Sequence, residues 1–81
     1  METQLYECNV LLNTLDKVKK FIEIVNISDV TIDALSEKYT VDGKSILGLL
    51  SLNLMNPIKL VVWGDQEIIR SLVSEISPYM V

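Results

Sequence analysis

The sequence has 81 residues, a formal net charge of −4 and no histidine. A chain of this length forms one domain, residues 1–81, whose core needs most of the aliphatic side chains. The acidic balance argues against a nucleic-acid surface, because such a surface needs clustered Lys and Arg to neutralise phosphates. No stretch approaches the roughly 18 uninterrupted apolar residues of a membrane span, and no signal peptide is recognisable. We therefore expect a cytoplasmic protein that contacts neither nucleic acid nor membrane.

The residue types that carry most enzyme and metal chemistry are scarce in this chain. The absence of histidine removes the commonest general base and the commonest metal ligand. Cys8 is the only cysteine, so neither an intramolecular disulfide nor a multi-cysteine metal site can form. The aspartates at predicted turns show no paired spacing that would indicate a metal or glycosidase site. We expect no enzyme activity, no metal and no cofactor.

Hydrophobic periodicity divides the chain into four strands and three helices. In the first strand Tyr6, Cys8 and Val10 alternate with polar residues, which indicates one buried face. In the last helix the apolar residues fall on one arc and the charged residues fall opposite, so this helix covers a core on one side. In chain order, we predict a strand over 4–12, a helix over 15–26, strands over 30–34 and 39–41, a helix over 46–52, a strand over 58–62 and a helix that ends near Pro78.

Local signals support these boundaries. Asn13 or Thr14 is expected to cap the first helix, Ser45 is expected to cap the second, and Asn56-Pro57 interrupts the chain before the last strand. The order β-α-β-β-α-β-α, with one apolar face on each element, favours an antiparallel sheet that is covered on one side. The predicted fold is an α+β open-faced sandwich with a four-stranded antiparallel sheet and three helices on one face.

Two segments, "DGKSILGLLSL" and "WGDQEIIRSLVSEI", together with this order of elements, resemble HPr, the histidine-containing phosphocarrier family of the bacterial sugar phosphotransferase system. Members of that family carry a Lys-Ser-Ile-x-Gly-x-x-Ser-Leu segment at the place of the first stretch. The resemblance covers most of the chain, and residues 42–52 are its specific part. It implies the HPr fold and a task connected with the phosphotransferase system.

The chain departs from the family where the family carries its phosphoryl group. HPr proteins have a Gly-x-His-Ala-Arg-Pro loop after the first strand, whereas this chain has "VLLNTLDK", with Leu12, Asn13 and Thr14 near the position of the histidine. A phosphoramidate requires the nucleophilic nitrogen of an imidazole. We therefore expect a non-catalytic HPr-like protein that cannot carry phosphohistidine.

Ser45 has two interpretations. The resemblance implies a regulatory phosphorylation site, because Ser45 matches the serine that HPr proteins of low-GC Gram-positive bacteria present to a dedicated kinase. A phosphate there would lie at the positive end of a helix, which favours an anion. The alternative is that Ser45 is only an N-cap, which contributes about 1 kcal/mol and is sufficient to explain a serine.

The leucines of the short helix point in more than one direction. Leu49 and Leu52 lie within about 60° of each other around the helix axis, whereas Leu47 and Leu50 lie about 100° or more away from both. The resemblance implies that Ile46, Leu47 and Leu50 form a docking surface for protein partners, among them phosphotransferase or regulatory proteins. The alternative is that a small leucine-rich core extends further around this helix.

The uncovered face of the sheet offers a second hypothesis, in which the protein is structural and forms a homodimer. Val61 and Trp63 fall on the face opposite to the helices, as do Leu5 and Leu11 in the first strand. The resemblance implies that these two strands are neighbours at the centre of the sheet, which brings Leu5 close to Trp63. We predict an apolar patch there that mediates self-association. The alternative is that Trp63 folds over the end of the sheet and polar residues divide the patch.

Overall fold

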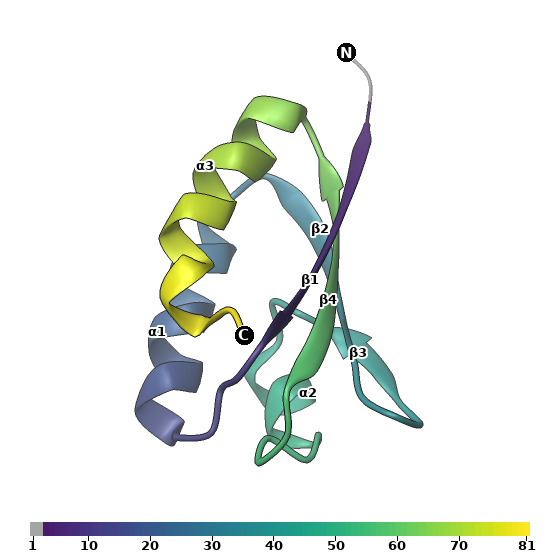
Figure 1. The fold of residues 1–81 in the computed structure, drawn as a ribbon, viewed down its shortest axis with the longest axis vertical. Helices are drawn as coiled ribbons and strands as arrows, with labels where there is room; N and C mark the ends of the chain where they lie inside the picture. Colours follow the sequence, from purple (N-terminus) through teal and green to yellow (C-terminus); the bar gives the residue numbers. More distant parts are fainter. Residues whose placement is uncertain (1–2) are drawn as a thin grey trace.

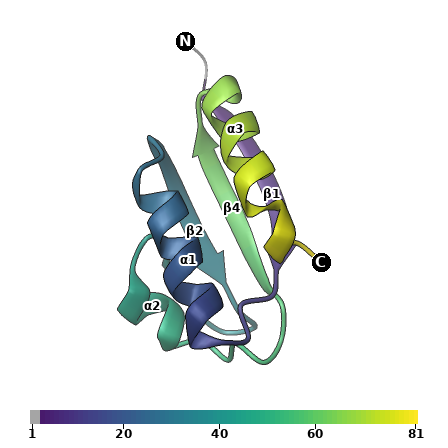
Figure 2. The same cartoon turned by 90° about the vertical axis from the view of Figure 1, so that its left-hand side faces the viewer.

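A computed structural model, which describes residues 3–81, has a four-stranded antiparallel sheet with helices packed on one face, as predicted (Figures 1 and 2). Seen from the helix side, α3 lies over β1 and α1 lies over β2 (Figure 2). The elements are β1 (Gln4–Val10), α1 (Leu15–Asn26), β2 (Val30–Leu35), β3 (Thr40–Asp42), α2 (Ile46–Leu50), β4 (Ile58–Gly64), α3 (Gln66–Ile76) and a short 3₁₀ helix, η1 (Ser77–Tyr79).

The order of strands in the sheet is β1-β4-β2-β3. β4 is a central strand that pairs antiparallel with both β1 and β2. The prediction that β1 and β4 are neighbours is confirmed, and Leu5 is the register partner of Trp63. The prediction that both strands lie at the centre of the sheet is wrong for β1. β4 lies between β1 and β2, and β1 is the edge strand of the sheet.

Several predicted boundaries move by one or two residues. β1 ends at Val10 rather than at residue 12 because its ladder partner there is Ile58, the first residue of β4, which Pro57 precedes. α2 ends at Leu50 rather than at residue 52, and Ser51 follows it as the C-cap. β3 spans 40–42 instead of 39–41, and β4 continues to residue 64.

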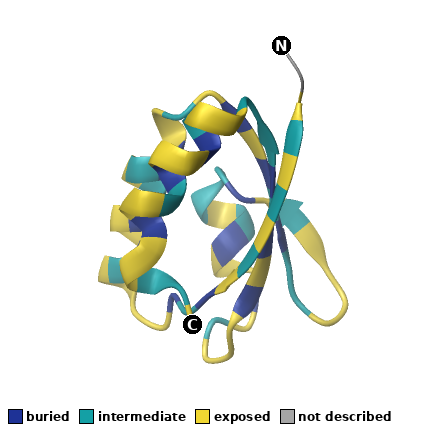
Figure 3. Ribbon diagram, turned by 45° about the horizontal axis from the view of Figure 1, so that its top comes forward, coloured by how far each residue is buried: buried dark blue, intermediate teal, exposed yellow. Residues whose placement is uncertain are grey.

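The core lies between the sheet and the helices, and the buried residues of α1, α3, β2 and β4 face it (Figure 3). α1 directs Val18, Phe21 and Val25 inward, and all three are fully buried. Each such side chain contributes about 1.5–3 kcal/mol by leaving water. From β4, α2 and α3, the buried apolar side chains are Ile58, Leu60, Val62, Leu49, Ile69, Leu72 and Ile76.

One glycine allows the turn before α2 to pack closely on β2. Gly43 is buried, and a Cβ added there would overlap Cγ2 of Ile32. The N–H of Gly43 also donates to the carbonyl of Ile32 (2.8 Å). The chain therefore packs closely against Ile32 of β2 at this point, directly before the start of α2.

Candidate functional site

The turn that leads into α2 is held by its own polar groups. A side-chain oxygen of Asp42 accepts from the N–H of Lys44 (2.9 Å), and the carbonyl of Asp42 accepts from the N–H of Ser45 (3.0 Å). Oγ of Ser45 in turn accepts from the N–H of Gly48 (3.0 Å). Ser45 is thus the N-cap of α2, as predicted, and its half-buried hydroxyl lies at the first turn of the helix.

Lys44 ties this turn to the end of α1. Its ammonium donates to the carbonyl of Ser28 (2.7 Å), and its own carbonyl accepts from the side-chain amide of Asn26 (3.3 Å). These residues were missed by sequence reasoning because the contacts join segments 16 and 18 residues apart. A Lys before a predicted N-cap was the only available signal, and it does not identify a partner. The tie fixes α2 relative to α1.

α2 has a buried side and an exposed side. Of the three residues predicted to form a docking surface, two are exposed. Leu49 is completely buried, whereas Leu47 is 78% and Leu50 46% exposed. Ile46 is half-buried and packs against the core. The three candidate residues, Ile46, Leu47 and Leu50, are called the helix patch below. An extended core accounts for Ile46, but it does not account for Leu47.

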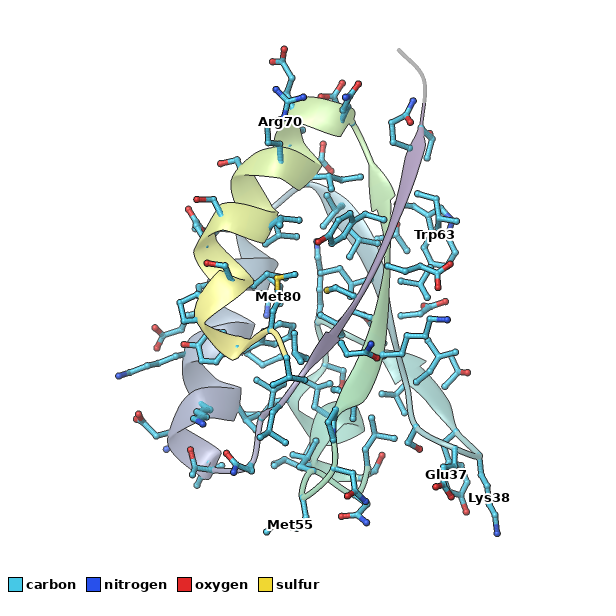
Figure 4. All side chains as sticks on the ribbon, viewed as in Figure 1. Glu37, Lys38, Met55, Trp63, Arg70 and Met80 are labelled. Carbon is cyan, nitrogen blue, oxygen red and sulfur yellow. The ribbon has the colours of Figure 1, made fainter. Side chains whose placement is uncertain are left out.

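The segment that follows α2 adds an apolar side chain that sequence reasoning missed. Met55 is 74% exposed in the loop between α2 and β4, at the lower end of the molecule (Figure 4). Leu52 is buried and Leu54 half-buried in the same loop. The signal in the sequence was an apolar residue directly before Asn56-Pro57, where a break in structure leaves side chains in solvent.

The start of α1 is capped by a side-chain hydroxyl. Oγ1 of Thr14 accepts from the N–H of Lys17 (3.1 Å), so Thr14 and not Asn13 is the N-cap. The side-chain oxygen of Asn13 accepts from the ammonium of Lys17 (3.1 Å). Leu12 is buried and contributes to the core. The Thr14 hydroxyl is therefore bonded to the helix backbone, and the Asn13 amide is bonded to the Lys17 ammonium.

The outer face of the sheet brings together some of the predicted interface residues. Leu5, which is 57% exposed, pairs with the half-buried Trp63, and Trp63 lies on the side of the sheet away from the helices (Figure 4). Val61 is half-buried and pairs with Glu7, and Glu7 is bound to Lys59 (2.6 Å between Nζ and Oε1). This ion pair stands within the predicted patch and divides it.

Leu11, the fourth predicted interface residue, lies beyond the end of β1. It directly follows Val10, is half-buried, and its N–H donates to the carbonyl of Tyr79. The predicted strand is two residues too long here because its partner β4 begins at Ile58. In the register of the two strands, Glu7 and Lys59 lie between Leu11 and the other three candidate sheet-face residues, Leu5, Val61 and Trp63.

Titratable groups near β1 are shielded rather than activated. Burial raises the pKa of the Cys8 thiol above its ordinary value. Burial, and to a lesser extent the neighbouring Cys8, raises the pKa of Tyr6. Both shifts favour the protonated, unreactive forms. Among residues 3–81 no group of three His, Cys, Asp or Glu side chains could hold a metal ion. Within the same span, every helix is too short or too polar to cross a membrane.

Comparison with known proteins agrees with this architecture. No family model matches the sequence, and no curated protein matches it. Among solved structures, the chain is similar to the crystal structure of HPr-C-His from Thermoanaerobacter tengcongensis, with a TM-score of 0.67 and 27% sequence identity. The match covers 95% of this chain and 92% of that chain. The two chains thus share an architecture over nearly their whole lengths, and the protein has the HPr-like open-faced sandwich fold.

Proposed function

We propose that this protein is a non-catalytic HPr-like module, related to the phosphotransferase system, that binds another protein through the helix patch. The observation that carries the proposal is the exposure of Leu47 and Leu50 on a helix that Ser45 caps and whose Leu49 is fully buried. Two large apolar side chains are exposed to solvent on a helix of five residues, although their burial would be favourable. Exposed apolar side chains that lie close together often mark an interface.

The chemistry of the chain supports binding rather than phosphoryl transfer. The sequence contains no histidine, so no imidazole nitrogen can form a phosphoramidate. At the start of α1 the Thr14 hydroxyl is committed to the cap, and an esterified threonine is a poor phosphoryl donor. The proposed role therefore retains the binding surface of the HPr fold without its phosphocarrier chemistry.

Phosphorylation of Ser45 is the regulatory step in this proposal. A phosphoryl group on its Oγ would add about 1.5–2 negative charges at pH 7 at the first turn of α2. Ile46 and Leu47 follow directly, so the charge would lie beside the helix patch. A partner that buries Leu47 would then have to desolvate or pair the phosphate, and its affinity would change.

Affinity capture from the native cell tests the helix patch. The double variant Leu47→Asp, Leu50→Asp should lose the partners that the wild type retains, with affinity for a purified partner reduced by about tenfold or more. Ile27→Asp is the matched control, because Ile27 is 84% exposed and lies after α1 rather than on α2. Partners that the double variant retains as well as the wild type does would contradict the proposal.

A second candidate function is self-association through the outer face of the sheet. The observation that favours it is the pairing of Leu5, 57% exposed, with Trp63 on the uncovered side. Sedimentation over a range of concentrations should then show a wild-type dimer that Trp63→Ser weakens. A wild type that stays monomeric at the highest concentration would exclude this candidate.

A further inference from the structure

The outer edge of β1 is only partly paired. β1 is an edge strand that pairs with β4 along its whole length. On the side of β1 away from β4, residues 79–81 pair with the end of this strand. The N–H of Leu11 donates to the carbonyl of Tyr79 (2.8 Å), and the N–H of Val81 donates to the carbonyl of Asn9 (3.0 Å). The ring of Tyr79 anchors this C-terminal segment by packing edge-on against Phe21, with ring centroids 6.3 Å apart. The edge therefore already carries the first pair of an antiparallel ladder.

The remaining part of this edge presents free backbone groups. Backbone groups of alternate residues point to the same side of a strand, so the residues that share the direction of Asn9 and Leu11 are Leu5 and Glu7. Within residues 3–81 their N–H and carbonyl groups have no partner on this side. The segment Gln4–Cys8, called the open edge below, therefore offers two donors and two acceptors in a row.

The open edge lacks the features that usually protect an edge strand. Such strands are commonly guarded by proline, bulges or outward lysines. The five residues, QLYEC, contain none of these, and their one charge, Glu7, is bound to Lys59 within the molecule. The ladder with β4 is continuous from residue 4 to residue 10, without a bulge.

Apolar side chains flank the open edge on both faces of the sheet. On the helix side Tyr6, Cys8 and Met80 pack against the core and remain partly exposed. On the outer side Leu5 is 57% exposed. A strand added at this edge would cover apolar surface on both faces and would also satisfy the backbone groups, which is how strand addition obtains affinity and specificity.

The position of α3 determines what kind of strand fits. Paired edge strands lie about 4.8 Å apart. Because α3 lies over β1 (Figure 2), an antiparallel second copy would place its own α3 over the neighbouring strand, beside the first α3. Packed helices need about 8–10 Å between their axes, which is more than the spacing of two paired strands. An antiparallel second copy therefore does not fit at this edge, whereas a lone extended segment without a helix above it does.

We propose that the open edge of β1 binds an extended segment of another protein as a fifth strand, antiparallel to β1 and continuing the direction of Tyr79–Val81. The segment would have an apolar side chain opposite Leu5 and a basic or polar one opposite Glu7. This site is independent of the helix patch, because it lies on β1 and not on α2, and either proposal can fail without the other.

The probe is a five-residue extension, Thr-Lys-Val-Val-Thr, appended to the full chain after Val81. In the register set by Val81 and Asn9, its lysine lies opposite Glu7 and its second valine opposite Leu5. The matched control is Thr-Pro-Val-Pro-Thr, which lacks the two N–H groups that would donate to β1. Amide exchange of Tyr6 and Cys8, which are bonded to β4, reports whether the fold is intact in both proteins.

The measured quantity is the exchange of the Leu5 and Glu7 amides. The first extension should slow both by about tenfold or more relative to the proline control. The same five-residue peptide added separately at high concentration should shift the amide resonances of β1 and leave those of α2 unchanged. Equal exchange in the two extended proteins would overturn the proposal. Protection of these amides in the unextended protein that increases with its concentration would overturn it too, because a second copy would then occupy the edge.

Discussion

The ammonium of Lys44 donates to the backbone carbonyl of Ser28 at 2.7 Å, and this contact joins the start of α2 to the loop that follows α1. α2 has only five residues, too few for a helix that is stable by itself. Its position therefore depends on three things: the Ser45 cap, the burial of Leu49 and the tie through Lys44.

Replacement of Lys44 by Met should destabilise the protein by about 1–2 kcal/mol, because a part-buried hydrogen bond from a charged group is lost and the carbonyl of Ser28 loses its partner. Urea denaturation measures the free energy of unfolding. Lys38→Met, in the exposed turn between β2 and β3, is the control and should change it by less than about 0.5 kcal/mol. Equal stability of the Lys44 variant and the control would show that the tie contributes nothing.

Ser45→Ala should cost about 1 kcal/mol, since the N–H of Gly48 loses its acceptor. Ser45→Asp should be nearly neutral for stability, because aspartate also caps a helix and suits its dipole. The same urea experiments measure both. If Ser45 is regulatory, the Asp variant should differ from wild type in affinity for the partner despite similar stability, and unchanged affinity would count against regulation.

The two sides of α2 should respond differently to truncation. Leu49→Ala should cost about 2–5 kcal/mol because it leaves a cavity in the core. Leu47→Ala, at a residue 78% exposed, should change stability by less than about 0.5 kcal/mol while weakening partner binding. A large loss of stability in the Leu47 variant would instead assign this side chain to the core.

Stability should fall in mildly alkaline solution because of Cys8. Burial raises the pKa of its thiol above the ordinary 9.0, so the unfolded chain releases this proton at a lower pH than the folded protein. The contribution of Cys8 is fully present below the unfolded pKa and is lost as pH rises through the folded one. The free energy of unfolding, measured from about pH 7 to 9.5, should decline in wild type more than in Cys8→Ala. Parallel pH profiles would contradict the assignment.

The parts of the fold that depend on local chemistry could be predicted from the sequence. Thr14 and Ser45 cap helices because a hydroxyl meets free N–H groups within three residues, and such contacts need no knowledge of the rest of the chain. The alternation of Tyr6, Cys8 and Val10 likewise fixed which face of β1 is inward, and the pairing of Leu5 with Trp63 followed from the family resemblance.

The parts that depend on distant segments could not be predicted. β1 ends at Val10 because β4 begins at Ile58, and β1 lies at an edge because β4 pairs with it on one side and with β2 on the other. Lys44 reaches Ser28 because the turn at Gly43 packs closely against Ile32 of β2. The exposure of Leu47 and Leu50 on α2 could be predicted, but what holds α2 in place is tertiary, and periodicity does not report tertiary contacts.

The central place of β4 determines when the protein can acquire its structure during synthesis. β1 and β2 never pair with each other, and both wait for the same strand, residues 58–64. Residues 1–50 therefore contain β1, α1, β2, β3 and α2 but lack the strand that joins them into one sheet. Because a ribosome adds residues in order and covers the newest part of the chain, this sheet cannot form until β4 has been translated and has left the ribosome. Until then, both strands that flank β4 in the finished sheet remain available to chaperones.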